Sequence, residues 1–199
     1  MPMPEGTGGG DEKNKSIMSA HLLHIAVKLV EAMDKGKEEA LPQEIADVVK
    51  LHAKIAVGSA WIPVPGADVA AGAANIWTMY LRINSKLGMK LGESALKTIA
   101  SAVATNLASY AAVLAVGGAM KFIPGIGSIG GAAIMSGALY AVTLASGYVY
   151  LKALTALVGK GGVVDENQLK ASVDDFLKNN KSEIKEFIKE AKKDYKNEN

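Results

Sequence analysis

The sequence predicts an all-α protein organised around a helical hairpin. Two uncharged stretches, Thr98–Met120 and Ile129–Leu151, flank a short middle segment whose one charge is Lys121. Each stretch is long enough for a helix of about 30 Å, which is also the hydrocarbon thickness of a bilayer. Pro124 lacks a backbone N–H and ends a helix, and the glycines beside it permit a tight reversal. This pattern predicts two helices folded back on one another, either in a membrane or in the core of a bundle.

Amphipathic helices are expected before the hairpin. They cover about residues 16–33, 42–61 and 68–86, with apolar residues three and four positions apart. Ser16 is placed to cap the first of these helices, and Pro42 suits the first turn of the second. Residues 1–15 are polar and rich in proline and glycine, so we expect a flexible tail there.

The two helix breaks share a pattern. We expect structural turns and caps at Pro63, Pro65, Gly66 and Asp68 in the first break, and at Pro124, Gly125, Gly127 and Ser128 in the second. In both, an Ile-Pro turn leads through a capping residue into a helix of small residues, and the two copies lie 59 residues apart. This predicts duplicated helical hairpins that form a four-helix, Ala/Gly-rich core.

The end of the chain is more polar than the hairpin. Asp165 is expected to cap a helix to about Asn179, and Ser182 a last helix, both amphipathic. Lys and Glu at three- and four-residue spacings on the last helix are typical of exposed helix faces. The predicted organisation is a tail (1–15), a hairpin core domain (16–160) and C-terminal amphipathic helices (161–199).

Composition narrows the class of protein. A net charge of +2 does not favour nucleic acid as a partner, and without cysteine there are no disulfides or thiolate metal sites. Charge is unevenly placed, because Val69–Val164 holds seven basic residues against one acid, a net +6. The start of the chain has no apolar run typical of a signal peptide, which predicts a cytoplasmic start.

No motif predicts catalysis, a cofactor or a metal. The run from Gly125 to Gly130 matches the dinucleotide pattern G-x-G-x-x-G, but a Lys and a Pro precede it, and the next acid is Asp165. The nucleotide-binding pattern G-x-x-x-x-G-K-[ST] is missing from the sequence. His21 and His24 share a helix face, yet His52 is distant and no further ligand converges on them. We therefore expect a non-enzymatic protein.

Small residues predict close helix packing. Gly127 and Gly131 lie about 40° apart on one helix, and Gly137 borders that face. Such pairs let a second helix approach closely in membranes and also in Ala-rich bundles. The partner is the other helix of the hairpin or a second copy of the chain, which makes a homo-oligomer an expectation.

The residues on either side of the hairpin indicate its location in the cell. Basic residues lie on both sides of it, at Arg82–Lys97 and at Lys152 and Lys160, which predicts cytoplasmic termini. Its polar, Ala-rich first half argues against a membrane span, whereas the absence of charge favours one. We expect a protein of the bacterial inner membrane in contact with lipid.

Two Ile-Pro segments carry a resemblance to a known family. The residues are Ile62-Pro-Val-Pro-Gly-Ala-Asp-Val69, with Met79 and Leu81, and Ile123-Pro-Gly-Ile-Gly-Ser-Ile-Gly130, with Thr143 and Gly147. They resemble the YcjF-type domain, a family of bacterial membrane domains often attached to or encoded beside Era-like GTPase domains. The resemblance covers about Ala53 to Leu157. It implies a membrane-associated helical domain with a GTPase partner, and it supplies no catalytic residues.

Three functions follow from these observations. The first is a membrane-associated helical protein that scaffolds, remodels or permeates a membrane, coupled to a GTPase. The second is a pore-forming or toxin-like protein, whose apolar hairpin is hidden in a soluble bundle and inserts from it. The third is a soluble helical protein-interaction module.

Overall fold

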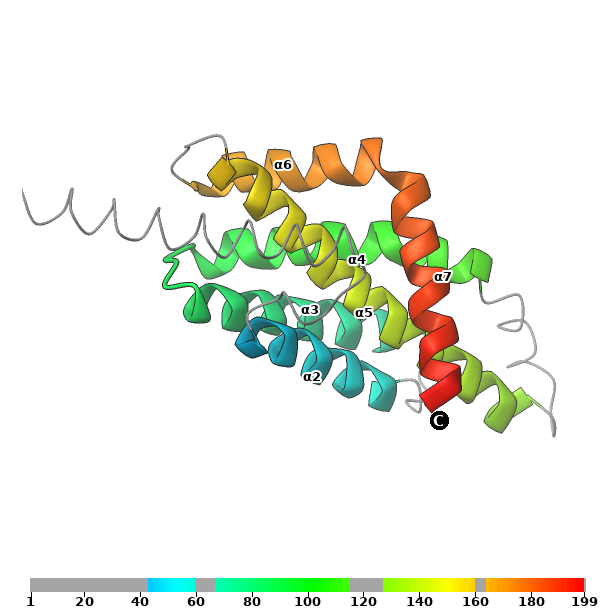
Figure 1. Ribbon diagram of the computed structural model, residues 1–199. Helices are drawn as coiled ribbons and strands as arrows, with labels where there is room; N and C mark the ends of the chain where they lie inside the picture. Colours follow the sequence, from blue (N-terminus) through cyan, green and yellow to red (C-terminus); the bar gives the residue numbers. More distant parts are fainter. Residues whose placement is uncertain (1–42, 60–66, 115–126, 160–163, 199) are drawn as a thin grey trace, which may run out of the picture.

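The computed structural model describes residues 43–59, 67–114, 127–159 and 164–198, and it confirms the all-α prediction (Figure 1). These residues form α2 (Gln43–Ser59), α3 (Ala67–Lys86), α4 (Glu93–Leu114), α5 (Gly127–Gly159), α6 (Glu166–Asn179) and α7 (Lys181–Glu198). The expected tail and the expected helix over 16–33 lie outside the described residues.

Helices α2 to α5 pack as a four-helix arrangement. They run in alternating directions in Figure 1, and contacts join α2 to α3, α3 to α4, α4 to α5 and α5 back to α2. The second and fourth helices, α3 and α5, are therefore parallel. Hydrogen bonds between them keep one register, from Tyr80 to Ser146 and from Tyr150 to Asn84. That the two hairpins arose by duplication stays a prediction.

The C-terminal helices complete the same core. Helix α6 packs on α4 and α5, and α7 crosses α5 (Figure 1). Their inward residues belong to the buried cluster that also contains the α2–α5 side chains; they are Leu169, Val173, Leu177, Ile184, Ile188 and Ala191. The outward faces carry Lys, Asp and Glu. The charge pattern of these two helices thus follows from their position on the outside of the bundle.

The two hairpin helices, α4 and α5, do not begin and end where the uncharged stretches begin and end. Helix α4 begins at Glu93, and α5 continues to Gly159, past the expected end at Leu151. The uncharged stretch Ile129–Leu151 is therefore only part of α5. Lys152 is tolerated inside α5 because its ammonium lies 5.6 Å from the centre of the Tyr148 ring, where the face of the ring attracts a cation.

Several helix ends are set by specific hydrogen bonds. The Asp165 cap is confirmed, because its carboxylate accepts from the N–H groups of Asn167 and Gln168. The Ser182 cap is wrong. Helix α7 begins one residue earlier, at Lys181, since the Ile184 N–H already donates to the Asn180 carbonyl at 3.0 Å.

The connection between α3 and α4 is held at both of its ends. Gly88 has a φ of 67°, and the N–H groups of Gly88 and Met89 donate to the carbonyls of Ser85 and Asn84, the two-bond ending of a Schellman motif. At the far end, the Gly92 N–H donates to the Glu166 carboxylate at 2.7 Å. This bond joins the start of α4 to the first residue of α6.

Candidate functional site: the buried central helix

Helix α5 is apolar on every side and lies in the middle of the bundle. Its buried side chains from Ala138 to Leu154 are mostly aliphatic, and α2, α3, α4, α6 and α7 all contact it. A helix that is hydrophobic all round has to be covered on all faces, by protein or by lipid. In this structure the neighbouring helices bury most of its side chains between Ser136 and Leu154, and each covering helix uses a different contact.

On the α2 side, Val49 packs directly against the α5 backbone at Gly147. A Cβ placed on Gly147 would lie 2.8 Å from Val49 Cγ1 and 3.1 Å from Val49 Cγ2. With Val49 in place, any side chain at position 147 would clash unless Val49 or the helix shifted. Gly147 is one of the residues that carry the family resemblance, and its physical role here is to let α2 pack directly onto the α5 backbone.

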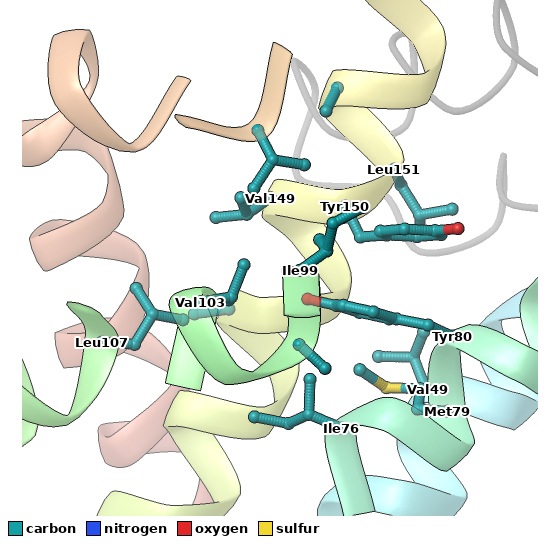
Figure 2. Packing of buried hydrophobic residues seen from close by; sticks show 14 of the residues in the cluster. Val49, Ile76, Met79, Tyr80, Ile99, Val103, Leu107, Val149, Tyr150 and Leu151 are labelled. Atoms are coloured by element: carbon teal, nitrogen blue, oxygen red, sulfur yellow. The ribbon is translucent and has the colours of Figure 1, made fainter. Parts of the chain in front are cut away.

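The α3 side is a stacked pair of tyrosines. The rings of Tyr80 and Tyr150 lie 4.0 Å apart and 13° from parallel, with their hydroxyls at opposite ends (Figure 2). Tyr80 donates to the Ser146 carbonyl at 3.0 Å, and Tyr150 donates to the Asn84 side-chain carbonyl at 2.9 Å. Burial raises the pKa of the Tyr80 hydroxyl well above its ordinary value, which keeps it a neutral donor. The pair therefore links helices and has no sign of an acid–base role.

The α6–α7 side combines aromatic and polar contacts. Tyr148 of α5 stacks on Phe187 of α7, with ring centres 4.7 Å apart, and its hydroxyl donates to the Glu183 carboxylate. Lower on α5, a Cβ on Gly137 would lie 3.2 Å from the Tyr195 ring, which also contacts the ring of Tyr140 at 5.1 Å. Three of these aromatic side chains are tyrosines, so part of this face is held by groups that can also hydrogen-bond to water.

A polar pair joins α2 to α3. His52 is 2% exposed, and its Nδ1 lies 2.7 Å from the Asn75 side-chain carbonyl, while the Asn75 amide donates to the His52 backbone carbonyl at 2.8 Å. His52 Nε2 is buried and has no hydrogen-bond partner among the described residues. Burial is the main cause that lowers the pKa of His52, and the charge of Arg82 lowers it further.

The expected turn, cap and packing residues are described in part. Pro63, Pro65, Gly66, Pro124 and Gly125 lie outside the described residues. Asp68 belongs to α3, and Gly127, Ser128 and Gly131 belong to α5, but no side-chain environment is described for them. Gly137 does pack closely, and the helix that it meets is α7, which sequence reasoning had not considered as the partner.

The polar contacts were missed from the sequence. Asn84 follows Tyr80 by four residues in α3, so both fall on one face of that helix. That spacing is the signal that could have shown a buried polar contact. The partners His52 and Tyr150 have no such signal, because they come from distant helices.

Within the described ranges no group of three or more His, Asp or Glu side chains is arranged to hold a metal ion. No helix in these ranges combines the length and apolarity needed to cross a membrane.

Comparisons with protein-family models, with curated proteins and with solved structures find no match. The resemblance to the YcjF-type family therefore stays a prediction.

Proposed function

We propose that this chain is a non-enzymatic, membrane-active helical protein that stores α5 inside its own bundle and exposes it to lipid when the covering helices separate. The observation that carries the proposal is the surface of α5, which is apolar on all sides yet covered by α2, α6 and α7. This corresponds to the second of the three functions considered from the sequence. It is favoured because α6 and α7 present charged residues outward, so that side of α5 meets lipid only after they move.

The internal hydrogen bonds of α5 are compatible with such a transfer. Ser146 is fully buried, and its hydroxyl donates to the Thr143 carbonyl of the same helix at 2.7 Å. A hydroxyl paired within its own helix keeps that bond when neighbouring helices leave, which lowers the cost of placing it in lipid. Small residues such as Gly137 and Gly147 leave little side-chain bulk on the faces that α7 and α2 cover.

A GTPase partner and a homo-oligomer belong to the same proposal. The first rests on the family resemblance and the second on the small-residue pairs of α5. Both the GTPase and a second copy of the chain are proposed to bind the hairpin after it leaves the bundle.

An engineered disulfide tests the separation of α2 from α5. A Cβ at position 147 lies 3.6 Å from the Val49 Cβ, within the about 3.5–4.5 Å found in disulfides. The chain has no other cysteine, so a Val49→Cys, Gly147→Cys protein can form only this internal bond. The oxidised or the reduced protein is mixed with vesicles of phosphatidylcholine and phosphatidylglycerol. Flotation then measures vesicle binding, and dye release measures permeation of the vesicles.

The expected result is vesicle binding and dye release by the reduced protein, and loss of both on oxidation. The Val49→Cys single variant, with and without reductant, is the matched control and should not respond to reductant. Equal activity of the oxidised and reduced forms would show that α5 need not leave α2. No vesicle binding by either form, or by the unmodified chain, would overturn the membrane proposal itself.

A further inference from the structure

His52 lies at a point where a single proton changes the contact between two helices. Because the Asn75 amide donates to the His52 carbonyl, the Asn75 side-chain oxygen faces the ring and accepts from Nδ1. In the neutral ring Nδ1 therefore carries the hydrogen and Nε2 does not. Protonation adds an N–H at Nε2, which is buried and has no acceptor among the described residues. An unpaired buried donor carrying a positive charge is strongly disfavoured.

We propose that His52 is an acid-sensitive contact, which holds α2 against α3 when neutral and loosens α2 when protonated, so that acid uncovers α5. This rests on the proposed function, whose trigger it would supply. The connection to α5 is short: Val49, which packs directly on Gly147, is three residues before His52 on the same helix. Movement of α2 at His52 thus removes the covering from α5 at Gly147.

The charged groups around the ring do not oppose this effect. On α3, the charge of Arg82 disfavours a second positive charge at His52. On α2 itself, Asp47 accepts from Gln43, and Glu44 pairs with Lys86 at 3.1 Å. Lys50 and Lys54 add positive charge to the same helix.

The titratable side chains of α5 have other partners. They are Tyr140 with Tyr195, Tyr148 with Glu183, Tyr150 with Asn84, and Lys152 with the Tyr148 ring. Among the residues that the structure describes, no carboxylate acts on His52 to stabilise its charged form.

The direction of the pH effect follows from linkage. The pKa of folded His52 lies below the ordinary 6.5, so the unfolded or opened state binds the proton more tightly. The contribution of His52 to stability is complete above pH 6.5 and is lost as the pH falls through the lower pKa of the folded ring. Mild acid therefore favours the state in which α2 has moved away.

The test compares three full-length proteins: the unmodified chain, His52→Gln, and a His21→Gln, His24→Gln control that changes the other two histidines. Vesicle flotation and the urea midpoint are measured between about pH 7 and about pH 5, the range in which imidazoles titrate. The unmodified chain and the control are expected to bind vesicles more and to unfold at lower urea on acidification. His52→Gln is expected to lose both responses.

A second variant keeps the inference testable if His52→Gln is unstable. Asn75→Asp places a carboxylate at Nδ1, where it stabilises the protonated ring, and it should weaken the acid response while the chain stays folded at neutral pH. An unchanged acid response in His52→Gln and Asn75→Asp would overturn the role of His52 and leave the membrane function standing. Vesicle binding by no protein at any pH would overturn the membrane function, and the urea midpoints would still decide whether His52 is the acid-sensitive contact.

Discussion

The crossing of α2 and α5 allows a prediction whose magnitude can be worked out. Gly147→Ala would place a Cβ 2.8 Å from Val49 Cγ1, closer than carbon atoms pack. Rotation of Val49 gives little relief, because its other methyl is 3.1 Å from the same point and β-branched side chains in helices favour one rotamer. Overpacking of this kind costs about 1–3 kcal/mol. Against it stands the better helix propensity of alanine, about 1 kcal/mol over glycine.

A matched control separates the cost of the clash with Val49 from the gain in helix propensity. Gly72 lies inside α3 with no atom within 4 Å of an added Cβ, so Gly72→Ala should show the propensity gain alone. The difference between the two variants in free energy of unfolding is then the cost of the clash, about 1–3 kcal/mol. Urea unfolding followed by circular dichroism measures it, since a change in midpoint at constant slope reports stability.

A double-mutant cycle measures the coupling between Val49 and position 147. Val49→Ala removes the two methyl groups that meet position 147, so Gly147→Ala in that background should no longer destabilise. The coupling energy between the two sites should be about 1–3 kcal/mol, within the range for residues in contact. If Gly147→Ala and Gly72→Ala stabilise the protein equally, α2 does not approach α5 at this crossing and the packing argument is wrong.

Three further changes are expected to affect stability, each measured by thermal or urea unfolding. Gly88→Ala should cost about 1–2 kcal/mol, because an alanine is strained at a φ of 67°; no loss would mean that the α3 end has another geometry. Asp165→Ala should cost about 1 kcal/mol through loss of the α6 cap, whereas Ser182→Ala should be nearly neutral, and the opposite order would restore Ser182 as the cap of α7. Tyr80→Phe should cost about 1 kcal/mol, since the ring still stacks but the bond to α5 is lost, and an unchanged melting curve would show that this bond contributes nothing.

Local chemistry explains which parts of the fold were predictable. Helix periodicity and the Asp165 cap act within a few residues, and the structure has α2, α3 and α6 close to the expected positions. The Ser182 prediction failed because Asn180, the one residue between α6 and α7, already accepts the first hydrogen bond of α7 through its carbonyl. Lys152 was predicted as a basic flank of the hairpin, and its contact with the Tyr148 ring appears only in the folded helix.

The contacts around α5 were harder to predict from the sequence than the helix positions were, because they depend on tertiary structure. Glycine spacing predicted close helix packing at Gly127, Gly131 and Gly137, and of these Gly137 does lie at such a contact. The close contact at Gly147 was not predicted from spacing. Which helices approach, α7 and α2, was decided by the packing of the whole chain. The contacts of His52 and Tyr150 likewise join distant helices, so no local pattern could show them.

The sequence by itself determined that this protein is helical and that the uncharged stretch Ile129–Leu151 forms a helix that needs cover, from lipid or from protein. The tertiary structure decided what covers it, namely α2 across Gly147, α3 through Tyr80, and α6 and α7 around Tyr148. The physical reason is that the hydrophobic effect has no direction. Lipid and protein remove the same apolar surface from water, so composition alone predicts burial, and only the arrangement of the other helices shows where the burial takes place.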